Sequence, residues 1–275
     1  MRNFIYGIII GLAFIIPGVS GGTLAVMLGI YDKMINSITS FFKDKKNNAI
    51  FILTLGAGIV IGILLFSKLL NYLLTYYEYP VKYAFMGLII GGVPALYQSI
   101  KKEKGTKIDF RITIIAILFC VGLFCIEKYF VNYSIEENII MGNIPYLGLI
   151  IAGFLYASGK IVPGISGTAL LMLIGMYDFL IDMVANVTSI TMDQLLILVP
   201  FGISFIVSAI ILFIIINYLI KKHYSKTYSA IFGFVLGSLI YVFPGFGNDK
   251  LLLSLVLFVL STILTAYLSN KKVIE

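Results

Sequence analysis

The sequence predicts an all-α polytopic membrane protein built from an inverted repeat, each half being a re-entrant helical hairpin followed by three transmembrane helices. Three observations predict this fold class. Only 12% of the 275 residues are charged and 60% are hydrophobic, whereas a soluble domain carries about 25% charged residues. Apolar stretches of about 17–25 residues, long enough to span a bilayer, recur along the chain. Many residues recur at a fixed offset of 146 positions.

Each half begins with an apolar region that a Pro-Gly-rich tip interrupts, at residues 4–41 and 148–181. Proline cannot continue a helix interior and glycine supplies turn conformations, so each region is interpreted as two helices joined by a tight tip. Non-helical backbone at membrane depth is tolerated only where protein buries it or where it faces a watery cavity. Each region is therefore expected to be a re-entrant hairpin with its tip near the bilayer midplane. The alternative is a pair of short spanning helices with an exposed turn.

Six further apolar stretches have the length of spanning helices. Three follow the first hairpin and three follow the second. Repeat 1 therefore covers residues 1–130 and repeat 2 covers residues 147–275, within a single membrane domain. The expected spans are 49–74, 82–99, 111–130, 195–220, 228–244 and 251–268.

The offset of 146 residues relates the two halves without a gap. It begins at the hairpin tips and continues into the second spanning helix of each half. A chance alignment would not keep its register through so many elements, so the sequence predicts a duplication. The pairs include Pro17 with Pro163, Gly18 with Gly164, Ser20 with Ser166, Gly29 with Gly175, Tyr31 with Tyr177, Asp32 with Asp178, and Gly87 with Gly233.

The charged residues predict the orientation of the two halves. If the hairpins do not cross, 14 Lys and Arg residues and four acidic residues lie on one side, against three Lys and seven acidic residues on the other. Cytoplasmic loops carry an excess of Lys and Arg. If each hairpin counted as a crossing, the basic clusters at 101–111 and 221–226 would lie on opposite sides. The distribution favours non-crossing hairpins, an inverted repeat, and two cytoplasmic termini.

Each hairpin tip has the pattern Pro-Gly-x-Ser-Gly followed by a new helix. A helix N-terminus has unpaired N–H groups and a partial positive charge, and glycines let the backbone approach a ligand. Two such tips converging at the centre suit a phosphate or a carboxylate, although a buried turn would use the same residues. The candidate phosphate-binding residues are Pro17, Gly18, Ser20, Gly21, Gly22, Thr23, Lys160, Pro163, Gly164, Ser166, Gly167 and Thr168.

Several charged residues lie in or beside apolar segments, where charges are costly and suggest function. Lys160, three residues before Pro163, would add a full positive charge to the tip site; the alternative is that it snorkels to an interface. Asp32 and Asp178 lie near the hairpin ends, where a helix-end role is an equal alternative. Together with Glu78 they are the candidates for coupling transport to an ion.

The composition also argues against several classes of function. Cys120 and Cys125 lie in one apolar run and form neither a disulfide framework nor a zinc pattern. His223 is the single histidine and lies in a basic cluster, so a histidine-dependent phosphatase has no residues to run it. The net charge of +7 reports membrane topology rather than nucleic-acid binding. The sequence predicts no cofactor, no metal and no catalytic residue, and it leaves a homodimer open.

The motifs PGVSGGT followed by LGIYD, and PGISGT followed by IGMYD, resemble the signatures of the bacterial undecaprenyl-phosphate translocase family of the PopT type, formerly a family of unknown function. The resemblance covers nearly the whole chain. It implies a flippase in the bacterial cytoplasmic membrane that returns the polyprenyl-phosphate carrier from the outer to the inner leaflet, for reuse in cell-wall and other envelope polymers. The role of Lys160 rests on the residues alone. The alternatives are a transporter or channel for a small soluble anion and an intramembrane lipid phosphatase.

Overall fold

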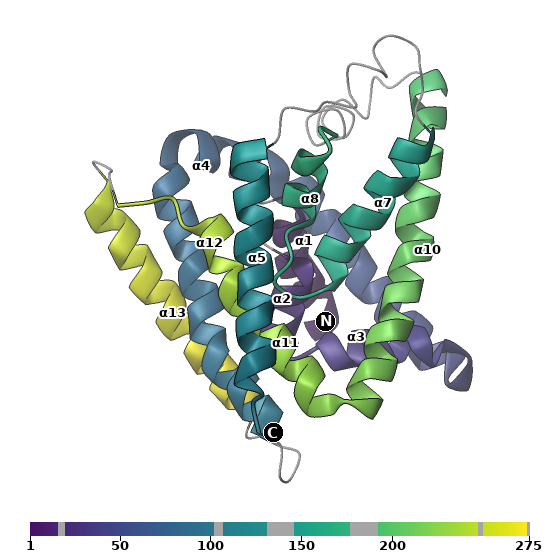
Figure 1. Cartoon of the computed structure of the whole chain (residues 1–275), viewed down its shortest axis with the longest axis horizontal. Helices are drawn as coiled ribbons and strands as arrows, with labels where there is room; N and C mark the ends of the chain where they lie inside the picture. The colour runs from purple at the N-terminus through teal and green to yellow at the C-terminus, as the bar shows by residue number, and fades with distance from the viewer. Residues whose placement is uncertain (16–19, 102–106, 131–145, 177–191, 247–249, 274–275) are drawn as a thin grey trace.

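The computed structural model describes residues 1–15, 20–101, 107–130, 146–176, 192–246 and 250–273, and these residues form helices and short connections without a β-strand. The helices are α1 (Arg2–Ile15), α2 (Gly21–Met27), α3 (Tyr31–Thr39), the 3-10 helix η1 (Phe41–Lys43), α4 (Lys45–Lys101), α5 (Phe110–Phe130), α7 (Tyr146–Ile161), α8 (Gly167–Leu173), α10 (Met192–Lys222), α11 (Tyr224–Gly237), α12 (Leu239–Val242) and α13 (Leu251–Val273). Figure 1 shows α13 and the second arm of α4 on one side of the bundle, α7 and α10 on the other, and α1 and α2 between them.

Among the described residues, four helical segments are long and apolar enough to cross a membrane: Lys45–Phe66, Tyr72–Gln98, Leu198–Lys222 and Tyr224–Val242. The expected spans 111–130 and 251–268 coincide with α5 and α13, whose apolar parts are shorter. Five of the expected spans each lie within one helix, whereas the span 228–244 is divided into α11 and α12 at Ser238 and ends in the non-helical residues Phe243 and Pro244.

Helix α4 contains two of the expected spans as the arms of one bent helix. The bend lies at Tyr77, whose φ of −137° and ψ of 36° are not helical. Pro80 lacks the N–H group that would bond to the carbonyl oxygen of Tyr76 four residues earlier. That oxygen instead accepts a hydrogen bond from Lys250 Nζ at 2.6 Å. The expected spans 49–74 and 82–99 are therefore joined by a bend inside one helix. Pro80 leaves the carbonyl oxygen of Tyr76 without its helical partner, and Lys250 binds this oxygen.

The expected second arm of the first hairpin is broken into α2 and α3 at Gly29. This glycine has φ of +62°, and the N–H groups of Gly29 and Ile30 donate to the carbonyl oxygens of Val26 and Ala25 at 2.9 and 3.0 Å. These two bonds form a Schellman motif, which ends a helix with a left-handed residue. Gly175, the repeat partner, also has φ of +62°. The hairpin therefore has a turn in its second arm that the sequence interpretation as two helices did not include.

Glycines bring α1 into direct backbone contact with the first arm of α4. A Cβ atom added to Gly58 would lie 2.2 Å from the carbonyl oxygen of Phe4, and one added to Gly11 would lie 2.5 Å from that of Ile59. No side chain fits at such distances, so the two helices approach more closely than larger residues would allow. Small residues repeated at helical spacing thus serve packing in this pair of helices.

The last helix of each half packs against the other half. A Cβ atom on Gly87, in the second arm of α4, would lie 2.3 Å from the carbonyl oxygen of Phe258 in α13. A Cβ atom on Gly233, in α11, would lie 2.4 Å from that of Thr113 in α5. Because Gly87 and Gly233 are 146 residues apart, the same contact occurs twice. Figure 1 shows α13 running beside α4 at the edge of the bundle.

The two ends of the bundle carry different charges. At one end Ser225 Oγ donates to the carbonyl oxygen of Lys107, and Asn217 Nδ2 donates to Thr39 Oγ1 at 3.0 Å. At the other end Glu78 forms an ion pair with Lys82. The exposed basic residues of the first end, the lower one in Figure 1, are Lys43, Lys45, Lys46, Lys107, Arg111, Lys221, Lys222 and Lys226.

The main hydrophobic core lies in the middle of the bundle, where α1, α2 and α3 meet α4, α10 and α11. Its most buried members include Ile35, Ile89 and Val235, each at most 1% exposed. A smaller cluster that includes Leu149 and Met176 lies under the second hairpin. The two hairpin tips therefore meet inside packed protein.

Candidate functional site

Side chains of the first hairpin bind the backbone of the second hairpin's tip. Ser20 Oγ donates to the carbonyl oxygen of Gly159 at 3.0 Å and is 3.2 Å from that of Val162. Tyr31 Oη, at the start of α3, donates to the carbonyl oxygen of Ile161 at 3.1 Å. These contacts join residues about 140 positions apart in the chain. The two tips, which the sequence predicted to converge, are thus in direct contact.

The reverse contact runs from the second tip to the first. The N–H group of Gly164 donates to Thr23 Oγ1 at 2.6 Å. Gly164 has φ of +83°, a conformation that glycine adopts readily. A Cβ atom on Gly22 would lie 2.6 Å from the carbonyl oxygen of Ile161. The absence of a side chain at Gly22 therefore serves tip-to-tip packing, while at Gly164 it serves packing against α11, because a Cβ atom there would lie 2.1 Å from the carbonyl oxygen of Phe234.

Lys160, on the last turn of α7, is only 3% exposed. Its Nζ atom is 3.3 Å from the carbonyl oxygen of Phe14 and 3.5 Å from that of Ala13, both in the last turn of α1. The ammonium also lies 5.0 Å from the ring centroids of Phe14 and Tyr156. The end of a helix carries partial negative charge, and ring faces attract cations. This burial is incompatible with snorkelling, because the ammonium does not reach an end of the bundle.

No ion pair with Lys160 is found among the residues that the structure describes. The full positive charge of this side chain is therefore met only by carbonyl oxygens and aromatic rings. A buried charge without a counter-ion is expensive and marks a functional site in membrane proteins. An anion that entered beside Lys160 would supply the missing negative charge.

A cavity of about 210 Å³ opens next to Lys160. Its walls are almost wholly apolar and come from α1, α2, the first arm of α4, α7 and α10, together with α3. Lys160 is the one charged residue among those that line it. The lining residues are Ile10, Phe14, Gly21, Met34, Ile38, Phe51, Ile52, Leu55, Gly56, Ile59, Lys160, Ile161, Phe205, Ala209 and Phe213.

The hydroxyl groups of both tips take part in hydrogen bonds within the protein. Ser20 and Thr23 bind the second tip, as described, and Ser166 Oγ lies 2.9 Å from Thr168 Oγ1. Helices α2 and α8 begin at Gly21 and Gly167, immediately after these serines. In this conformation the hydroxyls hold the tips closed, and only Gly21 and Lys160 of the candidate residues line the cavity. Pro17 and Gly18 lie outside the described residues.

The candidates for ion coupling are separated in the structure. Asp32, in the first turn of α3, accepts a hydrogen bond from Tyr228 Oη of α11 at 2.6 Å. It follows Tyr31, which binds the second tip directly. Glu78 lies at the opposite end of the bundle, in its ion pair with Lys82. Asp178 lies outside the described residues. Of the three, Asp32 is the one that the structure connects to the tips.

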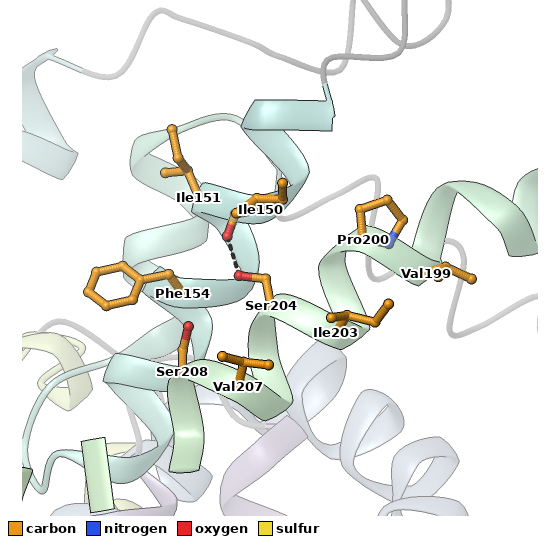
Figure 2. Close-up of a pocket in the computed structure, with 9 residues that line it drawn as sticks. All are labelled: Ile150, Ile151, Phe154, Val199, Pro200, Ile203, Ser204, Val207 and Ser208. Atoms are coloured by element: carbon orange, nitrogen blue, oxygen red, sulfur yellow. Dashed lines mark hydrogen bonds between the residues drawn. The ribbon is translucent and has the colours of Figure 1, made fainter. Parts of the chain in front are cut away.

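A second hollow of about 700 Å³ lies on the outer surface between α7 and α10 (Figure 2). Ser204 and Ser208 line it, and Ser204 Oγ donates to the carbonyl oxygen of Ile150 at 2.6 Å. The repeat places these serines where the first half has Gly58 and Gly62. Beside this hollow α7 and α10 remain in close contact, because a Cβ atom on Gly153 of α7 would lie 2.5 Å from the carbonyl oxygen of Phe201 in α10. None of the described residues that line this hollow is charged, so these residues offer no cation to bind a phosphate.

The sequence interpretation missed three residues of this site: Phe14, Tyr156 and Gly56. A signal for Phe14 was present, because the offset of 146 pairs Phe14 with Lys160. The structure brings these two repeat partners together, with the ammonium over the ring. The repeat alignment of Lys160 with an aromatic residue, Phe14, could therefore have predicted their contact. Gly56 is paired with Gly202 by the same offset.

The fold and the cavity define a polytopic α-helical membrane protein with one buried cation beside an apolar cavity. The model of the undecaprenyl phosphate translocase-like family matches residues 10–254, so the chain belongs to this family, as its two tip motifs suggested. A polyprenyl-phosphate transporter of Staphylococcus aureus is 32% identical over 272 residues, which cover 98% of this chain and 95% of that protein. A polyprenyl-phosphate transporter of Vibrio cholerae is 30% identical over 191 residues, 64% of this chain and 58% of that protein's length. No solved structure matches the chain.

Proposed function

We propose that this protein is a flippase that returns undecaprenyl phosphate, or a related polyprenyl phosphate, from the outer to the inner leaflet of the bacterial cytoplasmic membrane. The carrier would then be reused in envelope polymer synthesis. The observation that carries the proposal is Lys160, a buried cation without a described counter-ion in the wall of an apolar cavity. Both relatives named above are polyprenyl-phosphate transporters, which supports a lipid substrate.

The phosphate head binds beside Lys160, and the tips open to release their hydrogen-bonding groups to it. A phosphate monoester carries about −1.5 to −2 charges at neutral pH, so one ammonium cannot neutralise it alone. Ser20, Thr23, Ser166 and Thr168, whose hydroxyl groups are hydrogen-bonded at the tips, would add donors once their present partners separate. The apolar walls suit the first isoprene units of the tail.

The two halves form an inverted repeat, with the hairpins re-entrant and both termini in the cytoplasm. Three findings support this arrangement. The helix ends that carry Phe14 and Lys160 face each other. The packing of α13 on α4 recurs in that of α5 on α11. The basic clusters of both halves lie at the same end of the bundle, in keeping with the excess of Lys and Arg in cytoplasmic loops.

Inward transport of an anion opposes the inside-negative membrane potential. Moving one charge through 100 mV costs about 2.3 kcal/mol, and a dianion roughly twice that. A co-transported proton or cation would offset this cost, with Asp32, Asp178 and Glu78 as the candidate carriers. Asp32 is favoured because Tyr228 and Tyr31 connect it to both halves. Transport that is indifferent to both pH and sodium gradients would exclude such coupling.

The test is transport by the purified protein in vesicles that contain undecaprenyl phosphate. A phosphatase added outside hydrolyses only outer-leaflet phosphate, so a transporter makes the inner pool accessible over time. We expect Lys160→Met to slow this step about ten- to hundredfold, since a hydrogen bond to a charged group contributes about 1.5–3 kcal/mol. The double variant Ser20→Ala with Ser166→Ala should also lose transport.

Lys82→Met is the matched control, because Lys82 is in a surface ion pair with Glu78 and should transport as the wild type does. Wild-type rates for both Lys160→Met and the double serine variant would contradict the proposal. Uptake of inorganic phosphate into vesicles that contain the protein but no undecaprenyl phosphate would instead favour a transporter of small soluble anions.

A further inference from the structure

The cavity beside Lys160 is far too small for a polyprenyl chain. A water molecule occupies about 30 Å³ of liquid, so 210 Å³ holds the equivalent of about seven waters. Given the proposed function, on which this inference rests, almost the whole tail must lie outside the cavity while the head is bound. The tail therefore needs a lateral opening that leads from Lys160 to the lipid.

One rim of such an opening lies on the first arm of α4, at Gly56. Gly56 lines the cavity together with Ile52 and Ile59. Successive residues of a helix are about 100° apart, which places Gly56 at the edge next to Leu53 and Val60. These two side chains are 71% and 55% exposed on the outer surface. Gly56 thus stands at the boundary between the cavity and the lipid-facing side of the bundle.

The facing rim lies on α10, at Gly202. Phe205 and Ala209 of α10 line the cavity, and Gly202 lies one and two turns before them on the same face. On the outer side of this face, Ile206 and Ile210 are 59% and 46% exposed. Gly202 therefore lies one turn beyond the part of α10 that lines the cavity, beside the exposed Ile206, and it is the repeat partner of Gly56.

Packing does not account for these two glycines. A Cβ atom on either would have no heavy atom within 4 Å, whereas Gly58 and Gly11 have a carbonyl oxygen of the neighbouring helix within 2.5 Å. A glycine inside a helix costs about 1 kcal/mol relative to alanine. Gly56 and Gly202 therefore destabilise their helices, and no close helix contact offsets this effect as it does at Gly58 and Gly11.

We propose that Gly56 and Gly202 form the two rims of a lateral portal between α4 and α10, through which the polyprenyl tail passes while the phosphate is held at Lys160. Side-chain-free rims leave a smooth gap for a branched, unsaturated chain to slide past as the head moves. The buried ammonium at the inner end and the apolar walls together select an anionic head on a hydrocarbon chain. These glycines would therefore determine which tails can be transported.

The test compares Gly56→Leu and Gly202→Leu with the matched control Gly122→Leu. Gly122 also has open space around an added Cβ atom, but it lies on α5 and does not line the cavity. Each variant is assayed in vesicles by phosphatase accessibility with two probes, undecaprenyl phosphate and the much shorter farnesyl phosphate. Thermal unfolding in detergent measures whether each variant is folded.

We expect Gly56→Leu and Gly202→Leu to slow undecaprenyl phosphate transport by about tenfold or more, with a smaller effect on farnesyl phosphate, while Gly122→Leu transports both probes like the wild type. Wild-type transport of undecaprenyl phosphate by both rim variants would overturn the portal, and so would equal losses for the two probes. If Lys160→Met retains transport, the proposed function itself fails. If Lys160→Met is inactive and the rim variants are active, only the portal fails.

Discussion

The ammonium group of Lys160 is held by weak attractions that do not compensate its burial. A cation over an aromatic ring gains about 0.5–2 kcal/mol, and the two carbonyl contacts at 3.3 and 3.5 Å are long for hydrogen bonds. Removing an ammonium from water costs several kcal/mol even after the protein relaxes. The residue therefore opposes folding, and the proposed binding of a phosphate would explain its presence.

This balance predicts that Lys160→Met stabilises the protein while it slows transport. Methionine matches the length of lysine and suits the apolar surroundings of Phe14 and Tyr156. Replacing buried ionic groups by apolar residues of similar size is often neutral or stabilises by about 1–4 kcal/mol. Thermal unfolding in detergent should give a Tm equal to or above that of the wild type. A clear fall in Tm would mean that Lys160 chiefly holds the end of α1 in place.

At the scale of helices, the two halves have the same arrangement of helices but differ in the residues that pack them together. Gly58 and Gly62 keep the first arm of α4 in backbone contact with α1. Ser204 and Ser208 occupy the same repeat positions in α10 and line the hollow beside α7 (Figure 2). The two helix pairs therefore differ at these positions, although Gly153 also brings α7 into backbone contact with α10, where an added Cβ atom would lie 2.5 Å from the carbonyl oxygen of Phe201.

We predict that Gly58→Leu destabilises the protein strongly. Its Cβ atom would overlap the carbonyl oxygen of Phe4, and that atom belongs to a helix backbone that cannot yield. Overpacking costs about 1–3 kcal/mol or more, which should appear as a lower Tm in detergent. Gly122→Leu, in open space, should leave the Tm nearly unchanged. Equal Tm values for the two variants would contradict the close packing of α1 on α4.

At the scale of the whole molecule, the two ends of the bundle differ in charge, and we expect this difference to set the orientation in the membrane. The start of α5 and the junction of α10 with α11 lie at the lower end in Figure 1, and these segments of the two halves carry the exposed residues Lys107, Arg111, Lys221, Lys222 and Lys226. The opposite end has the bend of α4 and the short connection before α13, where Tyr83 Oη binds the carbonyl oxygen of Gly245 at 3.0 Å. An excess of Lys and Arg favours the cytoplasm.

Single cysteines in a variant without Cys120 and Cys125 test this orientation. We expect cysteines at Lys46 and Lys226 to react with a membrane-impermeant thiol reagent only from the cytoplasmic side. Cysteines at Glu78 and Phe246 should react only from outside, and all four residues are exposed in the structure. Labelling of positions 46 and 226 from opposite sides would contradict the non-crossing hairpins.

Much of this architecture could be predicted because the sequence contains an internal repeat, so the same pattern occurs in both halves. The paired glycines at 29 and 175 were visible at the fixed offset, and both have φ of +62°. The bend at Tyr77 could not be predicted, because it depends on Pro80 together with a lysine 170 residues further along. The phosphate-site hypothesis identified Ser20 and Lys160 but could not foresee that the serine would bind the opposite tip. Such a contact depends on how the two halves dock, which no local pattern encodes.

The exchange of α5 and α13 between the halves has a consequence for the origin of the chain. A half-length ancestor with one hairpin and three helices would have exposed the glycine face that now holds α13 or α5. We expect that such a half-length chain would bury that face by exchanging its last helix with a second copy. Fusion of the two copies into one chain would then make this exchange permanent.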